Sequence, residues 1–418
     1  MKTIILNQRK ERDELMSRSY LTRRMTQETD ILLKSPLIKL ITGPRRVGKS
    51  TQALQMLRTK NFAYLNFDNQ SLLESWDSDL VMRVLDEVYP GYEYLLLDEV
   101  QNLDSWDLWV SRLYRMGKNL VITGSNAKML SSEMATVLTG KYLQLEVLPF
   151  SLVEYFDWNG LDIHSEKAED KVEAEVMCDD YMRNGGYPEV VRVRQLTRSY
   201  LDTLFDSIVW KDIAKRHNVR KITELNNLAM YLVSNFCNPF TANEIKDVLG
   251  LSSVNTTKNF LEYLREPYLF YYLPRYNNKL RLMQNSPRKV YVVDNGFVTA
   301  KAFAHSENLG RLLENEVFVE LLRRGYDTEK SLFYYKTRND KEIDFVIRKG
   351  YQIERLIQVC YDMSSPKTEK REIDALVEGG GELKCTNMVV ITNNDERIIE
   401  QKGCKINVMP VRKFLAGT

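Results

Sequence analysis

A glycine-rich stretch of eight residues has the residue types and spacing with the clearest chemistry in this sequence. Its letters, GPRRVGKS, fit the pattern G-x-x-x-x-G-K-[ST] at every fixed position. The apolar run before it predicts a buried strand, and the apolar spacing after it predicts a helix. In that arrangement backbone N–H groups and the helix N-terminus can surround phosphates. The residues expected to contact a nucleotide are Gly43, Pro44, Arg45, Arg46, Val47, Gly48, Lys49, Ser50 and Thr51.

Two loop residues and two acids on another strand predict a site for a nucleoside triphosphate with magnesium. Lys49 would reach the β- and γ-phosphates, and the Ser50 hydroxyl would ligate Mg²⁺. The segment YEYLLLDEVQN predicts a buried strand with Asp98 and Glu99 at its carboxyl end, where ligands bind in open α/β sheets. Asp98 would hold Mg²⁺ through water, and Glu99 would polarise the attacking water as general base.

A third predicted strand, NLVITGSNA, ends in polar residues that could complete this site. Ser125 and Asn126 are candidates for a hydrogen bond to the γ-phosphate or the attacking water, and the pattern does not choose between them. A strand-to-helix turn with Ser125 as N-cap explains the same letters equally well. A further strand in FAYLNFDN is expected beside the strand that enters the glycine-rich loop. Four upstream residues are interpreted as part of a solvated helix, with a base pocket as the alternative: Tyr20, Leu21, Arg23 and Arg24.

These motifs resemble those of prokaryotic AAA-like P-loop ATPases, and so do the segments TGSNAKML and LTGKYLQLEVLPFSLVEYF. In that family a predicted ATPase domain is followed by a C-terminal domain of unknown function. The resemblance covers essentially the whole chain. It implies a RecA-like parallel sheet, ATP as the nucleotide, and the option of an oligomer that completes its sites across subunits. Lys141 stands where relatives carry arginine, and lysine lacks the bidentate fork of an arginine finger. Arg45, Arg46 and Arg183 are the alternatives for sensing the γ-phosphate.

The chain is expected to fold into four α/β and helical domains. The P-loop ATPase domain spans residues 1–157, and a helical lid or connector spans residues 158–225. A winged helix follows at residues 226–303, and a restriction-nuclease-like α/β domain at residues 304–418. By resemblance, the connector with its GGYPEVV segment would respond to the nucleotide state.

The sequence predicts a helix capped by Thr241 and closed by Gly250, and then a second helix capped by Ser252 or Ser253. A helix, a glycine turn and a second helix indicate the winged helix. The segments YLFYYLPRY and LRLM would form the strands of its wing, joined at Asn277 and Asn278. Some side chains of the second helix and the wing are of types that contact phosphates and base edges: Asn255, Thr256, Lys258, Asn259, Lys279 and Arg281. Winged helices of such ATPases also pack against proteins, so DNA and a protein partner are both candidates.

The last domain resembles the PD-(D/E)XK nucleases, whose fold has an acid on a helix, an aspartate on a strand and a strand ending in E-x-K. Glu314 would be the helix acid and Asp344 the strand aspartate, whereas the last motif reads QVC, with Gln358 and Cys360. Magnesium nucleases need paired carboxylates for the metal and a lysine to activate water. The sequence therefore predicts a nuclease-like fold that has lost catalysis. A weak nuclease that uses Glu314, Glu342 and Asp344 is the alternative.

Composition restricts the kinds of partner. The formal net charge is only +2 for 418 residues, so a nucleic-acid site must be a local patch, for which Lys336, Arg338 and Lys341 are candidates. No apolar run is long enough to span a bilayer, and the N-terminal apolar run is too short for a signal peptide. Five cysteines without a C-x-x-C pair predict reduced thiols in a cytoplasmic protein without a membrane partner.

The patterns together predict an ATP-driven switch. ATP with Mg²⁺ would bind in the loop, Asp98 and Glu99 would support slow or partner-stimulated hydrolysis, and the later domains would engage DNA or a protein. Two alternatives are an ATP-regulated nuclease, which the QVC segment disfavours, and a signalling scaffold that holds nucleotide without turnover.

Overall fold

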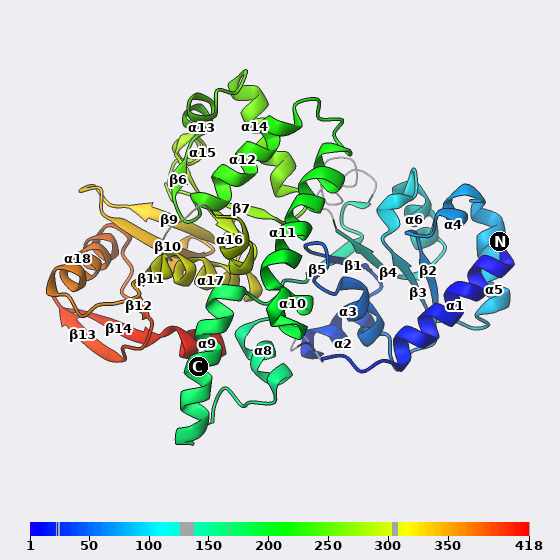
Figure 1. The fold of residues 1–418 in the computed structure, drawn as a ribbon, viewed down its shortest axis with the longest axis horizontal. Coiled ribbons are helices and arrows are strands. Elements are labelled where there is room, and N and C mark those ends of the chain that lie inside the picture. The colour runs from blue at the N-terminus through cyan, green and yellow to red at the C-terminus, as the bar shows by residue number, and fades with distance from the viewer. Residues whose placement is uncertain (22, 24–25, 126–137, 166, 303–307, 418) are drawn as a thin grey trace. The chain divides into compact units, whose positions relative to one another are not determined.

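The chain forms two compact units in the computed structural model (Figure 1). The first contains Met1–Leu148 with the short segment Glu266–Tyr268, and the second contains Pro149–Arg265 with Leu269–Thr418. The structure describes all residues except 22, 24–25, 126–137, 166, 303–307 and 418. Among the described helices, none is both long enough and apolar enough to cross a membrane. The division into four domains stays a prediction.

A parallel sheet of five strands, in the order β2-β3-β4-β1-β5, forms the centre of the first unit. Four of the strands are almost completely buried, as expected for short apolar strands in a parallel sheet covered on both faces. The strands are β1 (Ile38–Thr42), β2 (Phe62–Asn66), β3 (Tyr94–Asp98), β4 (Asn119–Gly124) and β5 (Tyr142–Glu146).

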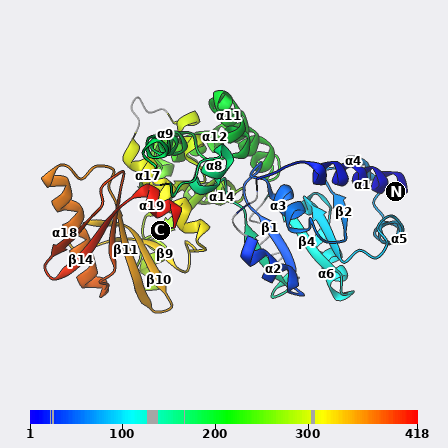
Figure 2. The same ribbon diagram turned by 90° about the horizontal axis from the view of Figure 1, so that it is seen from below.

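Helices pack on this sheet, and one hydrophobic core cluster holds the apolar side chains of one of its faces. The helix after the glycine-rich loop, α3, contacts β1 and β4, and α1 contacts β2 (Figure 2). Among the described residues, the helices of the unit are α1 (Lys2–Ser17), α2 (Thr26–Lys34), α3 (Lys49–Met56), α4 (Gln70–Glu74), α5 (Ser78–Val88), the 3₁₀ helix η1 (Val100–Asn102) and α6 (Trp106–Arg115).

The expected position of β2 beside β1 is wrong. Phe62 of β2 pairs with Tyr94 of β3, and Lys39 of β1 pairs with Val121 of β4, so β3 and β4 lie between the two strands. Parallel strands are joined by crossovers, and a local sequence pattern does not reveal how many strands a crossover passes. The strand itself is confirmed, but its place in the sheet is not.

The second unit begins with a helical region and continues into a small sheet, in the order β6-β8-β7. A capping box of Ser151 and Glu154 starts the first of these helices. The helical elements are α8 (Leu152–Asn159), α9 (Ala168–Asn184), α10 (Pro188–Arg192), the 3₁₀ helix η3 (Arg194–Leu196), α11 (Thr197–Ser207), the π-helix η4 (Ile208–Ala214) and α12 (Ile222–Ser234). Next come β6 (Pro239–Phe240), α13 (Ala242–Leu249), α14 (Val254–Arg265), β7 (Phe270–Pro274), α15 (Leu280–Asn285), β8 (Arg288–Val292) and α16 (Asn295–Lys301).

As expected, Thr241 caps α13 and Gly250 ends it, and α14 begins directly after Ser253, whose hydroxyl accepts a hydrogen bond from the Thr256 N–H. The prediction that LRLM forms the second strand of the wing is wrong. These residues belong to the helix α15, and the strand that pairs with β7 is β8. Leu280 and Leu282 are 62% and 49% exposed, so their alternation marks no buried strand face. The connection between β7 and β8 is therefore helical.

The C-terminal part has a mixed sheet of six strands in the order β13-β14-β12-β11-β10-β9. Strands β9, β10 and β11 are antiparallel neighbours, whereas β11, β12 and β14 are parallel. Helix α18 lies beside the sheet in Figure 2 and contacts β10 and β11. The elements are α17 (Leu309–Arg323), β9 (Leu332–Lys336), β10 (Glu342–Lys349), β11 (Gln352–Val359), α18 (Pro366–Leu383), β12 (Met388–Thr392), β13 (Arg397–Gln401), β14 (Cys404–Pro410) and α19 (Val411–Ala416).

A buried aspartate between β8 and α16 connects distant segments of the second unit. Asp294 accepts hydrogen bonds from the backbone N–H groups of Gly186 and Gly296, both at 2.8 Å. Burial raises the pKa of Asp294 to about 6, although the two N–H groups lower it. A Cβ atom on Gly186 would lie 2.1 Å from the Phe150 carbonyl oxygen. The double glycine therefore allows the chain to pass close to both Phe150 and Asp294.

We expect Gly186→Ala to lower the free energy of unfolding by about 3 kcal/mol, because the added methyl group collides with backbone atoms that cannot move independently. Denaturant unfolding followed by circular dichroism measures the change. Gly381→Ala is the matched control: its Cβ would meet no atom within 4 Å, and alanine in α18 should be neutral or stabilise by up to about 1 kcal/mol. Equal stability of Gly186→Ala and the native chain would show that the close approach is not required.

Candidate functional site

The glycine-rich loop joins β1 to α3 and is shaped by residues with positive φ. Gly43 has φ 139° and Gly48 has φ 93°, and Arg46 between them has φ 68°. A Cβ atom on Gly43 would lie 2.1 Å from the Val147 carbonyl oxygen, so only glycine fits there. Gly48 is the N-cap of α3 and carries the chain into the helix in the left-handed conformation. Consecutive loop N–H groups in such conformations form an anion-binding concavity.

A buried arginine holds the backbone of this loop. Arg23 is 8% exposed and donates to the carbonyl oxygens of Val47 at 2.7 Å and Leu148 at 3.0 Å. The interpretation of Arg23 as part of a solvated helix is wrong, since it is buried and lies between α1 and α2. Arg24 lies outside the described residues. Nothing in the local pattern indicates this contact, because it forms between segments distant in the sequence.

Lys49 and Ser50 lie at the start of α3, as expected. The Lys49 side chain is buried, and its ammonium donates to the Pro44 carbonyl oxygen at 2.9 Å. The Ser50 hydroxyl donates to Asp98 Oδ1 at 2.7 Å. These side chains are of the types that bind a nucleotide phosphate and Mg²⁺, and the short Ser50–Asp98 distance brings the two expected magnesium residues together.

Asp98 is surrounded by hydroxyl groups at the carboxyl end of β3. Besides Ser50, Thr123 Oγ1 donates to Asp98 Oδ1 at 2.5 Å, and Tyr64 Oη donates to Oδ2 at 3.3 Å. Burial raises the pKa of Asp98, and the Thr123 and Ser50 hydrogen bonds oppose that rise. The sequence did not single out Thr123 as a partner of Asp98. The rule that ligands gather at the carboxyl ends of strands could have found it.

Glu99 follows Asp98 and turns away from the strand, with φ 51°. Its backbone N–H donates to Thr123 Oγ1 at 2.9 Å, which fixes the turn. Its carboxylate accepts a hydrogen bond from the Gln101 side-chain amide, and Ser125 Oγ lies 3.5 Å from the same oxygen. Ser125 therefore lies beside the expected general base, whereas Asn126 lies outside the described residues.

Three cationic residues of the first unit, Arg45, Arg46 and Lys141, are considered for contact with the γ-phosphate. Arg45 and Arg46 both lower the pKa of Asp68, which burial and the charge of Glu99 raise. Asp68 follows β2 and accepts a hydrogen bond from Asn102 at 2.7 Å, so a further carboxylate that the sequence did not indicate lies near the loop arginines. Lys141 Nζ donates to Ser111 Oγ of α6 at 3.3 Å.

A second polar centre in the C-terminal part contains the acids that the nuclease resemblance indicated. Glu314 of α17 and Asp344 of β10 lie together, and Glu342 joins them. The ammonium of Lys289 from β8 contacts all three carboxylates, at 2.7 Å to Glu314, 2.7 Å to Glu342 and 3.1 Å to Asp344. The sequence did not indicate Lys289.

The other two expected nuclease positions make different contacts. Gln358 Nε2 donates to Glu372 Oε2 at 2.7 Å, and Cys360 Sγ donates to the Asp362 carbonyl oxygen at 3.3 Å. In the part of the chain that the structure describes, no group of three or more His, Cys, Asp or Glu side chains is arranged to hold a metal ion. The residues present therefore do not fit the metal of a nuclease centre.

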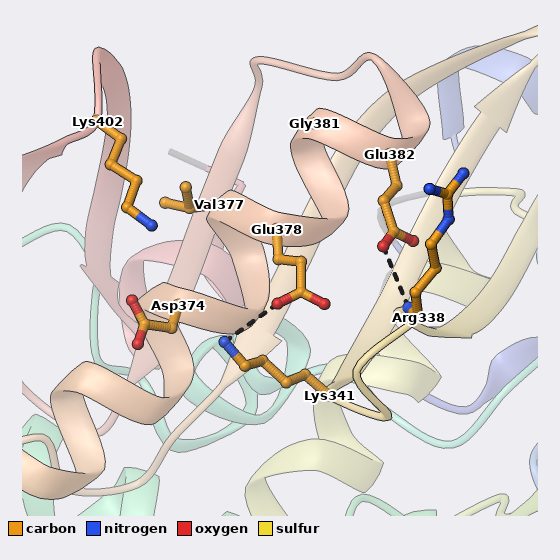
Figure 3. Close-up of a pocket in the computed structure, with 8 residues that line it drawn as sticks. All are labelled: Arg338, Lys341, Asp374, Val377, Glu378, Gly381, Glu382 and Lys402. Carbon is orange, nitrogen blue, oxygen red and sulfur yellow. Dashed lines mark hydrogen bonds and ion pairs between the residues drawn. The ribbon is translucent and has the colours of Figure 1, made fainter.

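The cations proposed as a nucleic-acid patch lie instead among acids. A pocket of about 560 Å³ between α18 and the β9–β10 connection has Lys341 paired with Glu378 at 3.2 Å (Figure 3). The backbone N–H of Arg338 donates to Glu382 at 3.1 Å, and Lys336 lies 3.3 Å from Asp340. The pocket has mixed charge: its lining residues are Arg338, Lys341, Asp374, Val377, Glu378, Gly381, Glu382 and Lys402.

Models of three known protein families match successive segments of the chain. A family model described as an AAA domain matches residues 35–156. Two domains of unknown function, DUF8612 and DUF4143, match residues 177–308 and 309–414. With the loop geometry and the parallel sheet, the first match defines an AAA-type ATPase domain.

Two curated proteins resemble nearly the whole chain. The uncharacterized protein MJ1544 of Methanocaldococcus jannaschii is 31% identical over 412 residues, which cover 93% of this chain and 90% of that protein. An uncharacterized protein of Haemophilus influenzae is 31% identical over 366 residues, which cover 83% and 88%. The chain belongs to the family of these two proteins.

Among solved structures, the Walker-type ATPase PABY2304 of Pyrococcus abyssi matches with a TM-score of 0.42 and 16% identity. The match covers 68% of this chain and 99% of that chain. At this level the likeness supports no inference about function.

Arg23→Ala should loosen the glycine-rich loop, because the carbonyl groups of Val47 and Leu148 lose a charged donor worth about 2 kcal/mol. We expect amide hydrogen exchange in peptides covering Gly43–Ser50 to become at least about tenfold faster. Arg18→Ala, which changes an exposed arginine of the same region, is the control and should leave exchange unchanged. Unchanged protection in Arg23→Ala would show that the loop holds its shape without this side chain.

Proposed function

We propose that this protein binds ATP with Mg²⁺ in the glycine-rich loop and hydrolyses it, as a nucleotide-operated switch whose second unit engages DNA or a protein. The observation that carries the proposal is the hydrogen bond between Ser50 and Asp98, at 2.7 Å, next to the buried Lys49. This hydrogen bond brings together a serine and an aspartate, the two residue types that P-loop nucleotide sites use for Mg²⁺, beside a loop whose backbone suits phosphate binding.

Each side chain has a role that follows from its position. The Lys49 ammonium would exchange the Pro44 carbonyl oxygen for phosphate oxygens, and Ser50 and Asp98 would hold Mg²⁺. Bound Mg²⁺ neutralises charge on the β- and γ-phosphates during phosphoryl transfer. Glu99 would orient the attacking water and accept its proton once its carboxylate leaves the Gln101 amide. Ser125, and Asn126 by sequence, would help to position that water.

Lys49→Ala and Glu99→Gln separate binding from hydrolysis. We expect Lys49→Ala to weaken ATP binding by about 10- to 100-fold, because a charged hydrogen bond contributes about 1.5–3 kcal/mol. Glu99→Gln should keep ATP affinity within about threefold and lower the hydrolysis rate by about 100-fold or more. Fluorescent-nucleotide titration and phosphate release measure the two quantities.

Glu93→Gln is the matched control, because Glu93 is an exposed glutamate next to the opposite end of β3. It should change neither quantity. Binding without measurable hydrolysis by the native chain, with or without DNA, would contradict the enzymatic part of the proposal. A nucleotide-gated scaffold would then account for the site.

The helix pair α13 and α14, with the three-stranded sheet, supports the proposal of a winged helix in the second unit. Asn255, Lys258 and Asn259 lie exposed on α14, and Lys279 and Arg281 are exposed beside α15 and within it. Exposed polar and basic side chains of this kind suit phosphate and base contacts. DNA is therefore the partner that we test first.

The double variant Lys258→Ala/Lys279→Ala should weaken DNA binding and reduce the slope of log affinity against log salt by about 2, since each lysine neutralises one phosphate. Fluorescence anisotropy with duplex and single-stranded DNA at several salt concentrations measures this. Lys370→Ala changes an exposed lysine of α18 and is the control. Affinity and salt slope equal to those of the native chain would exclude this face from DNA binding and leave a protein partner.

A further inference from the structure

We propose that Lys289 is the built-in cation of the buried site formed by Glu314, Glu342 and Asp344, and that its ammonium takes the place of a divalent metal ion. The C-terminal part then has a nuclease-like acid cluster whose cation belongs to the protein itself. The proposal concerns a centre in the second unit and does not depend on ATP hydrolysis.

The Lys289 ammonium lies within ion-pair distance of three carboxylates and donates hydrogen bonds to Glu314 and Asp344. An ammonium group has three N–H donors and no acceptor. Its nitrogen lies 2.7 Å from Glu314, 2.7 Å from Glu342 and 3.1 Å from Asp344, and the Lys289 side chain is only 1% exposed. A buried charge must be paired. Here one ammonium is paired with three carboxylates from two elements, of which Glu314 and Asp344 are 13% and 8% exposed and Glu342 is 30% exposed.

The backbone around Lys289 holds the ammonium in place. Lys289 lies in β8, the central strand of its sheet, and pairs with Pro239 on one side and Leu273 on the other. The strand therefore cannot shift without breaking two ladders. Lysine at this position is a fixed part of the site and differs from a mobile surface side chain.

The carboxylates are also fixed before any ion could bind. Glu314 accepts a hydrogen bond from Tyr291 Oη at 2.7 Å, and Asp344 Oδ2 accepts one from the Val359 N–H at 2.9 Å. Burial and the neighbouring Glu314 raise the pKa of Asp344, and the Lys289 ammonium opposes that rise. Both carboxylates are therefore held by protein donors as well as by the ammonium.

A divalent ion and the ammonium exclude each other. Carboxylate oxygens suit Mg²⁺ and Mn²⁺, but the metal needs oxygens at about 2.0–2.2 Å, in the same space as the ammonium. At the two other positions of the nuclease motif, Gln358 Nε2 donates to Glu372 and Cys360 Sγ to the Asp362 carbonyl oxygen, whereas the buried Gln358 Oε1 has no hydrogen-bond partner among the described residues. An internal cation can balance part of the charge of these acids without a bound metal ion.

The test is the number of Mn²⁺ ions bound per chain, measured by electron paramagnetic resonance on the full-length protein without nucleotide. Glu314→Gln should bind as many Mn²⁺ ions as the native chain, since the cluster holds none. Lys289→Ala should gain one ion, and Lys289→Ala/Glu314→Gln should lose it again. Any Mn²⁺ at the glycine-rich loop is present in all four proteins and cancels.

Thermal unfolding gives a second readout. Lys289→Ala should melt at least about 5 °C lower than the native chain, and Mn²⁺ should restore much of that loss. Lys330→Ala, which removes an exposed lysine of the same unit, is the control and should change neither melting nor Mn²⁺ binding. If Lys289→Ala does not fold, Lys289→Ala/Glu342→Gln has one acid fewer and should show the gained ion.

Two results would overturn the proposal. One is a native chain that loses a bound Mn²⁺ on Glu314→Gln, which would make the cluster a metal site already, as a metal-dependent nuclease requires. The other is a folded Lys289→Ala or Lys289→Ala/Glu342→Gln protein that gains no Mn²⁺.

Discussion

A carboxylate taken out of water must be matched by donors or by a cation, and both polar centres of this protein follow from that requirement. At the end of β3, three hydroxyl groups surround Asp98, and Ser50 is the one that links it to the glycine-rich loop. In the C-terminal part, the ammonium of Lys289 forms ion pairs with the carboxylates of Glu314, Glu342 and Asp344. Neutral hydroxyl groups donate to Asp98, whereas Glu314, Glu342 and Asp344 share contacts with one buried ammonium.

This difference separates the two centres chemically. A serine hydroxyl can exchange its bond to Asp98 for a bond to Mg²⁺, so the first centre suits a ligand that comes and goes. Lys289 is anchored in the middle of a sheet and cannot leave without disturbing two strand ladders. The two centres thus differ in their donors: hydroxyl groups surround Asp98, whereas an ammonium anchored in a sheet contacts the three acids of the second centre.

The same requirement shapes the core of the second unit. Asp294 is buried and takes its donors from the backbone of Gly186 and Gly296. These N–H groups come from segments far apart in the sequence. The hydrogen bonds to Asp294 therefore connect the end of α9 with β8 and α16. Side-chain size at Gly186 is limited for the same reason, since the chain must approach Phe150 closely to reach Asp294.

The sequence by itself determined the parts of the protein that depend on neighbouring residues. The glycine-rich loop, the strand before Asp98 and the helix pair α13 and α14 follow from spacing, capping and apolar runs, all of which act over a few residues. The tertiary structure alone decided what distant segments do to one another: that β2 lies at the sheet edge, that Arg23 supports the loop, and that LRLM becomes a helix in the β7–β8 connection. It also decided that Lys289 meets Glu314 and Asp344, because the partners of a buried charge are set by folding in space and leave no local pattern.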